Sequence, residues 1–258
     1  MKNKAKSTML FLDIETSPSL GYVWGKWEQN VLEFEKEWHI MSFSVKDIGK
    51  KASTYALPDY KVSYKKDKED DKELMKVLWK YLDTAEIVCA HNGKKFDMKK
   101  INSRFVYHGL PLPSPYKVVD TLQEARKHFG FTSNKLDDLG RYLKIGRKLS
   151  HTGFKLWLDC LKGDMKAWAT MKRYNEQDVI LLEKLYKRLL PYMNNHPPAG
   201  MYNGKPMSCP NCGSGHVQRR GIMKTRTNIY QRFQCQDCGA WSKSTKSEKT
   251  LTKPLVGV

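Results

Sequence analysis

An apolar run that ends in two acidic residues, one position apart, most constrains how this chain can fold. Residues 9–12 are Met-Leu-Phe-Leu, and Asp13 and Glu15 follow directly. A short apolar run predicts a buried strand, and strand side chains alternate between faces, so both carboxylates should project on the same side. Neighbouring carboxylates repel each other, and a divalent cation relieves that repulsion. We therefore predict a cation site at the end of a core strand, with an ordinary exposed strand end as the alternative.

Two later segments also carry acids, one after a predicted strand and one on a predicted helix. Residues 85–90 predict a second buried strand, which leads through a turn to Asp97 in the first turn of a helix. Residues 171–190 predict an amphipathic helix on which Tyr174 and Asp178, four residues apart, share one face. Each feature alone is typical of helix caps and surface acids. Together, and in this order, they predict a single site.

These three segments resemble the motifs of a known enzyme superfamily. Asp-x-Glu, then Asn-x-x-x-Phe-Asp at residues 92–97, then Tyr-x-x-x-Asp resembles the DEDD superfamily of DnaQ-like 3′–5′ exonucleases, over about residues 7–192. The histidine subtype would need a histidine five residues before Asp178, where this chain has Arg173, so the resemblance is to the tyrosine subtype. It implies an RNase H-like α/β fold, with a mixed sheet flanked by helices. We interpret Asp120, Asp137 and Asp138 as helix-start residues.

The resemblance also implies a mechanism. Asp13, Glu15, Asp97 and Asp178 would hold two Mg²⁺ or Mn²⁺ ions at a terminal phosphodiester, and oxygen ligands suit these ions better than zinc. Tyr174 would orient the attacking water, because a phenol with a pKa near ~10 is a poor base at neutral pH.

Candidate nucleic-acid contacts lie near these acids. Asn92, Lys94 and Lys95 precede Asp97, and the lysines could contact the scissile strand or belong to a solvated helix surface. Trp24 and Trp27 follow the first strand and could stack on terminal bases or cover the sheet.

Charge and composition favour an anionic partner. The chain has 258 residues, with 46 Lys and Arg against 27 Asp and Glu, and a net charge of +19. This excess of positive charge favours a protein that binds nucleic acid; the alternative is a soluble basic protein that binds no polyanion. No apolar run follows Met1, so we expect no signal peptide, no membrane segment and a cytoplasmic location in a bacterial or phage-infected cell. Six cysteines in such a chain indicate reduced thiols or metal.

The C-terminal part predicts a separate metal-binding module. We expect an exonuclease domain over residues 1–192, a proline- and asparagine-rich linker over 193–206, a zinc ribbon over 207–245 and a basic, flexible tail over 246–258. Two Cys-x-x-Cys-Gly motifs are typical of a four-cysteine structural Zn²⁺ site, and a redox dithiol is the rival interpretation. The predicted zinc ligands are Cys209, Cys212, Cys235 and Cys238.

The ribbon is itself basic. Residues 200–258 hold ten Lys or Arg and two acids. Basic side chains neutralise phosphates, and aromatic side chains can stack on bases. The candidate contacts are Arg219, Arg220, Lys224, Arg226 and Arg232; Tyr230 and Phe233 could stack or form the small core of the ribbon.

The sequence therefore predicts a two-metal-ion 3′–5′ exonuclease acting on DNA, at single-stranded or frayed ends, with a ribbon that aids binding. A 3′–5′ exoribonuclease of the same mechanism is one alternative, since no residue reports on the 2′-hydroxyl. A non-catalytic nucleic-acid-binding adaptor is a less favoured one, because a relic has no physical reason to keep all five site residues. Protein partners are not predicted.

Overall fold

The structure, a computed structural model, describes residues 7–27, 30–202 and 207–250. Two compact units make up the chain: Met1–Gln123 with Phe131–Leu185, and Glu124–Gly130 with Tyr186–Val258. The domain boundary predicted after residue 192 and the linker after it stay predictions, although the segment expected to be irregular holds a short helix. Most of the tail expected to be flexible, residues 251–258, lies outside the described residues.

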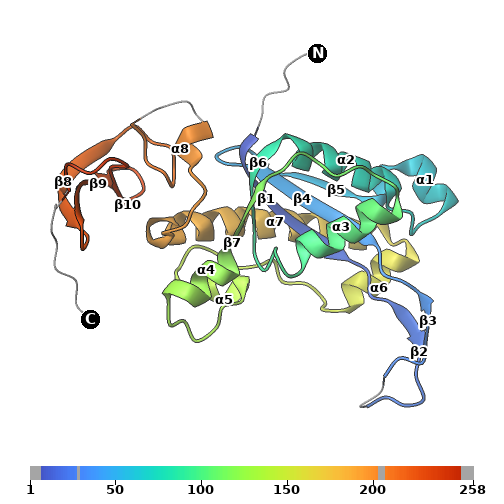
Figure 1. Cartoon of the computed structure of the whole chain (residues 1–258). Coiled ribbons are helices and arrows are strands. Elements are labelled where there is room, and N and C mark those ends of the chain that lie inside the picture. Colours follow the sequence, from blue (N-terminus) through green and yellow to red (C-terminus); the bar gives the residue numbers. More distant parts are fainter. Residues whose placement is uncertain (1–6, 28–29, 203–206, 251–258) are drawn as a thin grey trace. The chain divides into compact units, whose positions relative to one another are not determined.

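The elements follow one another in the order that Figure 1 colours from blue to red. The first part contains β1 (Ser7–Thr16), β2 (Leu20–Tyr22), β3 (Glu33–Lys36), β4 (Ile40–Asp47), β5 (Ser53–Ala56), η1 (Leu57–Asp59), α1 (Lys61–Lys66), α2 (Lys72–Thr84), β6 (Ala85–Ala90), α3 (Asp97–Tyr107), β7 (Lys117–Asp120), α4 (Thr121–His128), α5 (Leu136–Tyr142), α6 (Lys155–Lys162) and α7 (Met165–Leu189). The rest contains η2 (Leu190–Tyr192), α8 (Ala199–Tyr202), β8 (Val217–Lys224), β9 (Asn228–Cys235), β10 (Trp241–Lys243) and β11 (Lys249–Thr250).

A mixed five-stranded sheet forms the centre of the first unit. Its order is β5-β4-β1-β6-β7, with β1, β6 and β7 parallel and β4 and β5 antiparallel to their neighbours. This confirms the predicted mixed sheet, and β1, its middle strand, is the apolar run that precedes the two acids. Parallel strands end at the same edge, so β1 and β6 deliver the segments that follow them to one place.

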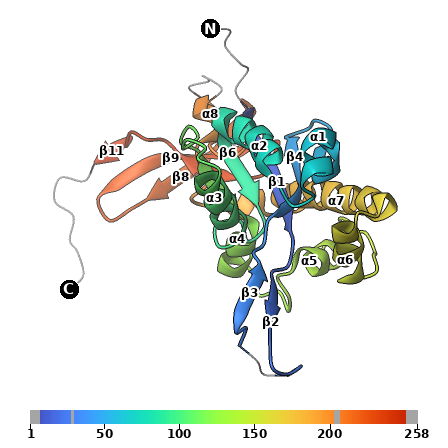
Figure 2. The same ribbon diagram turned by 90° about the vertical axis from the view of Figure 1, so that its right-hand side faces the viewer.

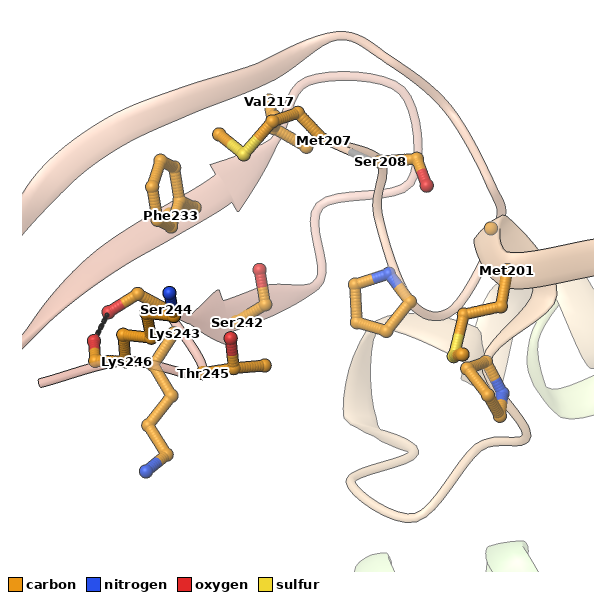
Figure 3. A pocket seen from close by; sticks show the side chains of 13 residues that line it. Met201, Met207, Ser208, Val217, Phe233, Ser242, Lys243, Ser244, Thr245 and Lys246 are labelled. Carbon is orange, nitrogen blue, oxygen red and sulfur yellow. Dashed lines mark hydrogen bonds between the residues drawn. The ribbon is translucent and has the colours of Figure 1, made fainter. Parts of the chain in front are cut away.

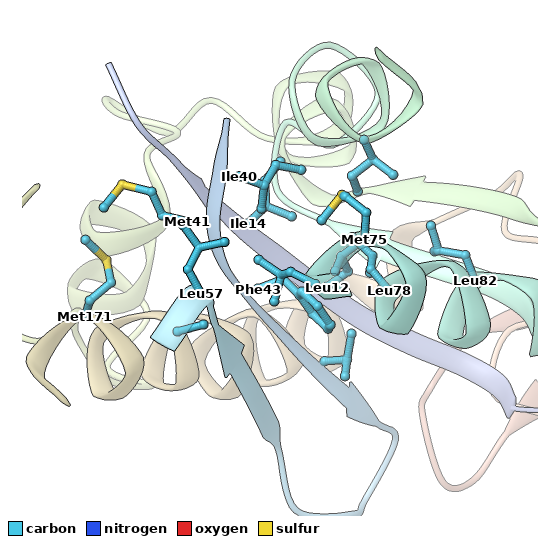
Figure 4. Close-up of a cluster of buried hydrophobic side chains, with 14 of the residues drawn as sticks. Leu12, Ile14, Ile40, Met41, Phe43, Leu57, Met75, Leu78, Leu82 and Met171 are labelled. Carbon is cyan, nitrogen blue, oxygen red and sulfur yellow. The ribbon is translucent and has the colours of Figure 1, made fainter. Parts of the chain in front are cut away.

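Helices cover both faces of this sheet. In Figures 1 and 2, α2 and α3 lie on one face and α7 runs along the other. Leu12 and Ile14 of β1 and Phe43 of β4 are buried, and Met75 and Leu78 of α2 belong to the same core cluster (Figure 4). Alternation along β1 turns Asp13 and Glu15 to the other face. On that face the buried Lys46 of β4 and Glu183 of α7 form a salt bridge of 2.8 Å.

A two-stranded ribbon leaves the sheet between β1 and β4. The connection between β1 and β4 forms the antiparallel pair β2–β3, which extends away from the sheet in Figure 2. Trp24 and Trp27 lie in the loop joining the two strands and are 87% and 74% exposed. Neither therefore covers the sheet, and the Lys26 ammonium lies 5.1 Å from the ring centroid of Trp27.

The second unit contains a small antiparallel sheet beside the cysteines. β9 is its middle strand and pairs with β8, β10 and β11. Its buried cluster consists of Cys209, Cys235 and Ala240, with Cys212, Val217 and Cys238 packed against them. So small a cluster supplies little burial free energy, so the four sulfurs are the centre of the core beside this sheet.

Candidate active site

Three acids meet where β1 passes α7. One carboxylate oxygen from each of Asp13, Glu15 and Asp178 lies within 4.8 Å of the other two. The register of β1 against β4 shifts between Glu15 and Thr16, a local irregularity of the kind that re-aims side chains next to functional sites. The strand and helix placements predicted from the sequence therefore bring these three residues together.

Asp97 lies near this group, on the turn after β6, but outside the set of oxygens within 4.8 Å of one another; its charge acts on Asp13. It is buried at the start of α3, and its Oδ1 accepts a hydrogen bond of 3.3 Å from the backbone N–H of Ile14 on β1. The turn is tight: Asn92 has φ of 67°, and a Cβ on Gly93 would lie 2.4 Å from the Cβ of Ala90. Asn92 thus shapes the turn that presents Asp97, and Phe96, 39% exposed, directly precedes the acid.

Asp120 stabilises the same turn without joining the cluster. Its carboxylate accepts hydrogen bonds from the backbone N–H groups of Asn92 (3.0 Å) and Lys94 (3.1 Å), and from Leu122 and Gln123 at the start of α4. Asp137 likewise accepts from the backbone N–H of Lys148 (2.7 Å). Both residues act on backbone groups, in agreement with their interpretation as structural acids.

Burial and mutual repulsion raise the pKa values of the clustered carboxyls. Burial, then the charges of Asp178 and Glu15, holds the pKa of Asp13 well above its usual range. Burial and Asp178 raise the pKa of Glu15 to about 8. Burial raises the pKa of Asp97 to about 7, and burial also raises that of Asp178, where Lys148 opposes it. The protein thus holds several carboxylates together at an energetic cost, which a bound cation would offset.

Lys148 is the positive charge in this site, and sequence reasoning missed it. Its ammonium donates to Asp178 Oδ2 at 2.6 Å and to the Tyr174 hydroxyl at 2.8 Å. Burial would lower the pKa of Lys148, but Asp178 and Asp13 outweigh burial and raise it. Burial and Asp178 raise the pKa of Tyr174 as well. Lys148 therefore stays cationic and Tyr174 stays a phenol at neutral pH.

The donor set fits a divalent cation. Oδ1 of Asp178 is buried, and no hydrogen-bond donor reaches it within the part of the chain that the structure describes. Carboxylate oxygens are the ligands that Mg²⁺ and Mn²⁺ favour, and a buried acceptor without a donor is costly unless a cation takes the place of the donor. Asp70, Asp71 and His108 also cluster. The carboxylate of Asp71 already accepts hydrogen bonds of 2.6 and 2.8 Å from the Arg104 guanidinium, so we interpret this cluster as a structural ion pair and not as a metal site.

Two cavities lie next to Tyr174 and Lys148, the residues that accompany the acids. One of about 420 Å³ is lined by Thr16, Ser17, Pro18, His151, Gly153, Phe154 and Trp157. His151 and Trp157 also reach Tyr174, with ring centroids 4.7 and 6.1 Å away. The other, of about 630 Å³, is lined by Arg147, Lys148, Leu149, Ser150, Arg173, Glu176, Gln177 and Ile180. An aromatic cavity therefore lies beside Tyr174, and a mainly basic one is lined by Lys148, the residue that contacts Asp178.

The second unit brings the four predicted zinc ligands together. All four sulfurs lie within 4.8 Å of one another, and Cys209–Cys238 and Cys212–Cys235 are each 3.6 Å apart. A tetrahedral Zn²⁺ with Zn–S bonds of ~2.3 Å separates its sulfurs by ~3.8 Å. The glycines after the two motifs, Gly213 and Gly239, have φ of 76° and 81°. The donor set and spacing therefore fit a four-thiolate metal site.

The predicted nucleic-acid contacts lie on several surfaces. Arg219, Arg220, Lys224, Arg226 and Arg232 are exposed on and between β8 and β9. Lys94 and Lys95 flank the turn that leads to Asp97. Trp24 and Trp27 lie in the β2–β3 loop. Their role in binding stays a prediction.

The fold and the carboxylate cluster define an α/β protein of the nuclease type with a site suited to divalent cations. The chain belongs to the RNase_H superfamily, whose family model matches residues 10–190. This confirms the RNase H-like fold. No curated protein sequence matches the chain.

A solved structure shares the architecture. The family B DNA polymerase from the hyperthermophilic archaeon Pyrobaculum calidifontis superimposes with a TM-score of 0.52 and 16% sequence identity. The match covers 71% of this chain and 24% of the polymerase chain, so it reports on the fold of one portion of that protein. No helix within residues 7–27, 30–202 and 207–250 is both long and apolar enough to cross a membrane.

Proposed function

We propose that this chain is a two-metal-ion 3′–5′ exonuclease that hydrolyses terminal phosphodiesters of DNA at single-stranded or frayed ends. One observation carries the proposal: oxygens of Asp13, Glu15 and Asp178 lie within 4.8 Å of one another, and the Tyr174 hydroxyl shares the Lys148 ammonium with Asp178. Membership of the RNase_H superfamily supports nuclease chemistry in general.

Asp13, Glu15, Asp97 and Asp178 would hold the Mg²⁺ or Mn²⁺ ions. Bound there, such ions activate water and stabilise charge on a phosphate. Tyr174 accepts from Lys148 and would orient the attacking water through its own O–H. Lys148 would stabilise negative charge developing on the phosphate.

The aromatic cavity suits the base of the terminal nucleotide. Phe154 is 60% exposed at this cavity, and His151 and Trp157 form a wall that continues to Tyr174. A base that stacked there would place its own phosphate beside the acids that adjoin the cavity at Thr16.

In the second unit, one structural Zn²⁺ bound by the four cysteines would organise the ribbon, and its arginines would add affinity for the nucleic-acid backbone. A redox dithiol is less suited to the arrangement, because two pairs converge on one centre.

The test uses oligonucleotides labelled at the 5′ end: single-stranded DNA, duplex DNA and RNA, each with Mg²⁺ or Mn²⁺. We expect a ladder that shortens from the 3′ end, fastest on single-stranded DNA. Faster RNA degradation would assign an exoribonuclease of the same mechanism.

Asp13→Asn and Asp178→Asn should abolish the ladder while nucleic-acid binding persists, because each removes a charged ligand. Surface acid Glu35, exposed on β3, offers the matched control Glu35→Gln. Normal turnover by either aspartate variant would overturn the site assignment, and binding without any hydrolysis by the unmodified chain would favour the adaptor.

A further inference from the structure

The sheet of the ribbon has two chemically different faces. In the register of β9, Tyr230 and Arg232 lie on one face, and Phe233 lies on the other. β10 adds Lys243 opposite Arg232, and Trp241 opposite Gln234, to the first face. We call this surface, defined by Tyr230, Arg232, Trp241 and Lys243, the cation–aromatic face.

The opposite face is taken up by an apolar cavity within the same unit. Phe233 lies opposite Ser242 of β10, and with Val217, Met201 and Met207 it lines a cavity of about 870 Å³ (Figure 3). Phe233 is thus assigned to the interior side of the ribbon. Stacking by Phe233, one of the two options left open by the sequence, is not favoured by this position.

Rings and cations alternate across the cation–aromatic face. The Arg232 guanidinium lies 4.5 Å from the ring centroid of Trp241, and the Lys243 ammonium lies 3.5 Å from that of Tyr230. Trp241 is 49% exposed, and Arg232 and Lys243 are exposed as well. Arg232 Nε also donates to the backbone oxygen of Arg220 at 2.9 Å, a single hydrogen bond on the exposed surface.

We propose, on the basis of the function proposed above, that the cation–aromatic face binds single-stranded nucleic acid, with bases stacked on Trp241 and Tyr230 and phosphates paired with Arg232 and Lys243. Trp241 lies opposite Gln234, which is four positions from Tyr230 on β9. Because a strand rises by about 3.4 Å per residue, the two rings are separated by roughly 14 Å along the strand. The two cations lie between them, where the backbone of a strand stacked on both rings would pass.

The cations that now cover the rings do not block this role. An exposed cation–π contact is weaker than the stacking of a base on an aromatic ring. Both cations end in flexible, exposed side chains that can exchange a ring for a phosphate, a stronger charge-assisted partner. In the free protein the rings and cations therefore already alternate in the order in which the bases and phosphates of a bound nucleic-acid strand would meet them.

Charge and ring exposure select the ligand. Residues 207–250 contain two acids, Asp237 and Glu248, and no acid is among the strand residues that the register places on this face, so a polyanion meets mainly positive charge there. An unpaired strand can offer the faces of its bases to the rings, whereas a duplex keeps its bases stacked inside. The face therefore favours a single strand over a duplex.

The test measures affinity of the full-length chain, carrying Asp13→Asn to prevent hydrolysis, for fluorescent oligothymidylate and for a blunt duplex. Trp241→Ala should weaken single-strand binding on the order of 5–100-fold and duplex binding much less, and Trp241→Phe should restore most of the loss. Arg232→Ala or Lys243→Ala should each reduce the salt slope by about 1. Each variant must retain one bound zinc.

Matched controls lie on the opposite face. Ile222, opposite Gln231, allows Ile222→Ala as a truncation of similar exposure, and Lys249, opposite Ile229, allows Lys249→Ala as an equal loss of charge. Neither should change single-strand affinity. Unchanged binding by Trp241→Ala, equal losses for single strand and duplex, or displacement of the oligonucleotide by polyglutamate at equal affinity would each overturn the proposal, the last in favour of an acidic protein.

A small substrate separates this proposal from the exonuclease proposal. The p-nitrophenyl ester of thymidine 5′-monophosphate is too small to span both rings of the ribbon. With Asp13 intact, the unmodified chain should hydrolyse it, and this rate reports on the acid site alone. Failure of the unmodified chain to hydrolyse any substrate would count against the exonuclease while leaving the binding comparison readable.

Discussion

The side-chain amide of Asn175 on α7 donates to Oδ2 of Asp13 on β1 at 2.5 Å, and Asn175 is fully buried. The amide also accepts from the Ser42 hydroxyl on β4 at 3.3 Å. One amide thus connects the helix that carries Tyr174 to the strand that carries Asp13. Groups that orient metal ligands in this way set the affinity of the site.

Asn175→Ala should weaken the apparent affinity for Mg²⁺ or Mn²⁺ by roughly 10–100-fold, because Asp13 loses the donor that orients it. A titration of hydrolysis rate against metal concentration measures the change. Ser42→Ala removes only the outer hydrogen bond and should have a smaller effect. Equal metal dependence in Asn175→Ala and the unmodified chain would show that Asp13 needs no such support.

Lys148→Met should affect two properties in different ways. The hydrolysis rate should fall on the order of 10²–10³-fold, since a donor that stabilises developing charge is lost. The metal-free protein should also melt at a lower temperature, because Asp178 loses its counter-charge at 2.6 Å. Added Mg²⁺ should recover the melting temperature and leave the rate low. Lys148→Arg keeps the charge and serves as the control.

Tyr174→Phe should be impaired but active. It loses one orienting hydroxyl and no ligand charge, which predicts a loss on the order of 10–1000-fold in rate. Single-turnover hydrolysis of a labelled strand measures it, with the exposed Tyr107→Phe as a matched control. A variant as inactive as Asp13→Asn would assign Tyr174 a direct chemical role, and full activity would remove it from the site.

The stability of the protein without Mg²⁺ should fall as pH rises from 7 to about 8 and should level off by pH 9. The folded-state pKa values of Glu15, about 8, and Asp97, about 7, exceed those of the unfolded chain, so the folded state binds more protons and loses stability as pH rises. The buried His39 and His196 have lowered pKa values and are neutral throughout this window. The melting temperature should fall by up to ~3–6 °C per pH unit for each group.

Saturating Mg²⁺ should raise the melting temperature more at pH 9 than at pH 7, because metal and protons compete for the same oxygens. Glu15→Gln should flatten the pH dependence. A melting temperature that rises with pH in the metal-free protein would contradict the assigned shifts.

Cys235→Ser should reduce bound zinc from one per chain to none and unfold the ribbon, whose core is built from the cysteines. Affinity for single-stranded DNA and its salt slope should both fall, as they should on truncation after Asn195. Asn211 of the ribbon segment donates to the backbone oxygens of Leu190 and Met193, so truncation should also lower the melting temperature modestly. If the unmodified, Cys235→Ser and truncated chains bound single-stranded DNA with equal affinity, the ribbon would instead be assigned a role in binding protein.

Local patterns account for what the sequence predicted. Asp13 and Glu15 share a face through strand alternation, and Tyr174 and Asp178 share one through helical spacing, so each pair was visible within a few residues. The resemblance to the exonuclease superfamily implied the mixed sheet. The β2–β3 ribbon was not predicted, because every residue of β3 is exposed and no buried face imposes a pattern.

Lys148 could not be singled out from the sequence, where it is one of 46 basic residues. Its place depends on tertiary packing: a Cβ on Gly140 would lie 2.7 Å from the backbone oxygen of Gly146, which lets the loop before Lys148 lie against α5. Asn175 was hidden for a similar reason. Its partners, Asp13 and Ser42, are more than 130 positions away in the chain.

The four backbone hydrogen bonds accepted by Asp120 complicate any census of ligands by mutation. Replacing Asp120 would release the turn at Asn92 and Lys94 and displace Asp97, although Asp120 itself lies outside the cluster. A screen scored by activity alone would therefore count one acid too many. Measuring the number of metal ions bound per chain in each variant distinguishes the acids that bind the ion from Asp120, which only holds the turn that positions Asp97.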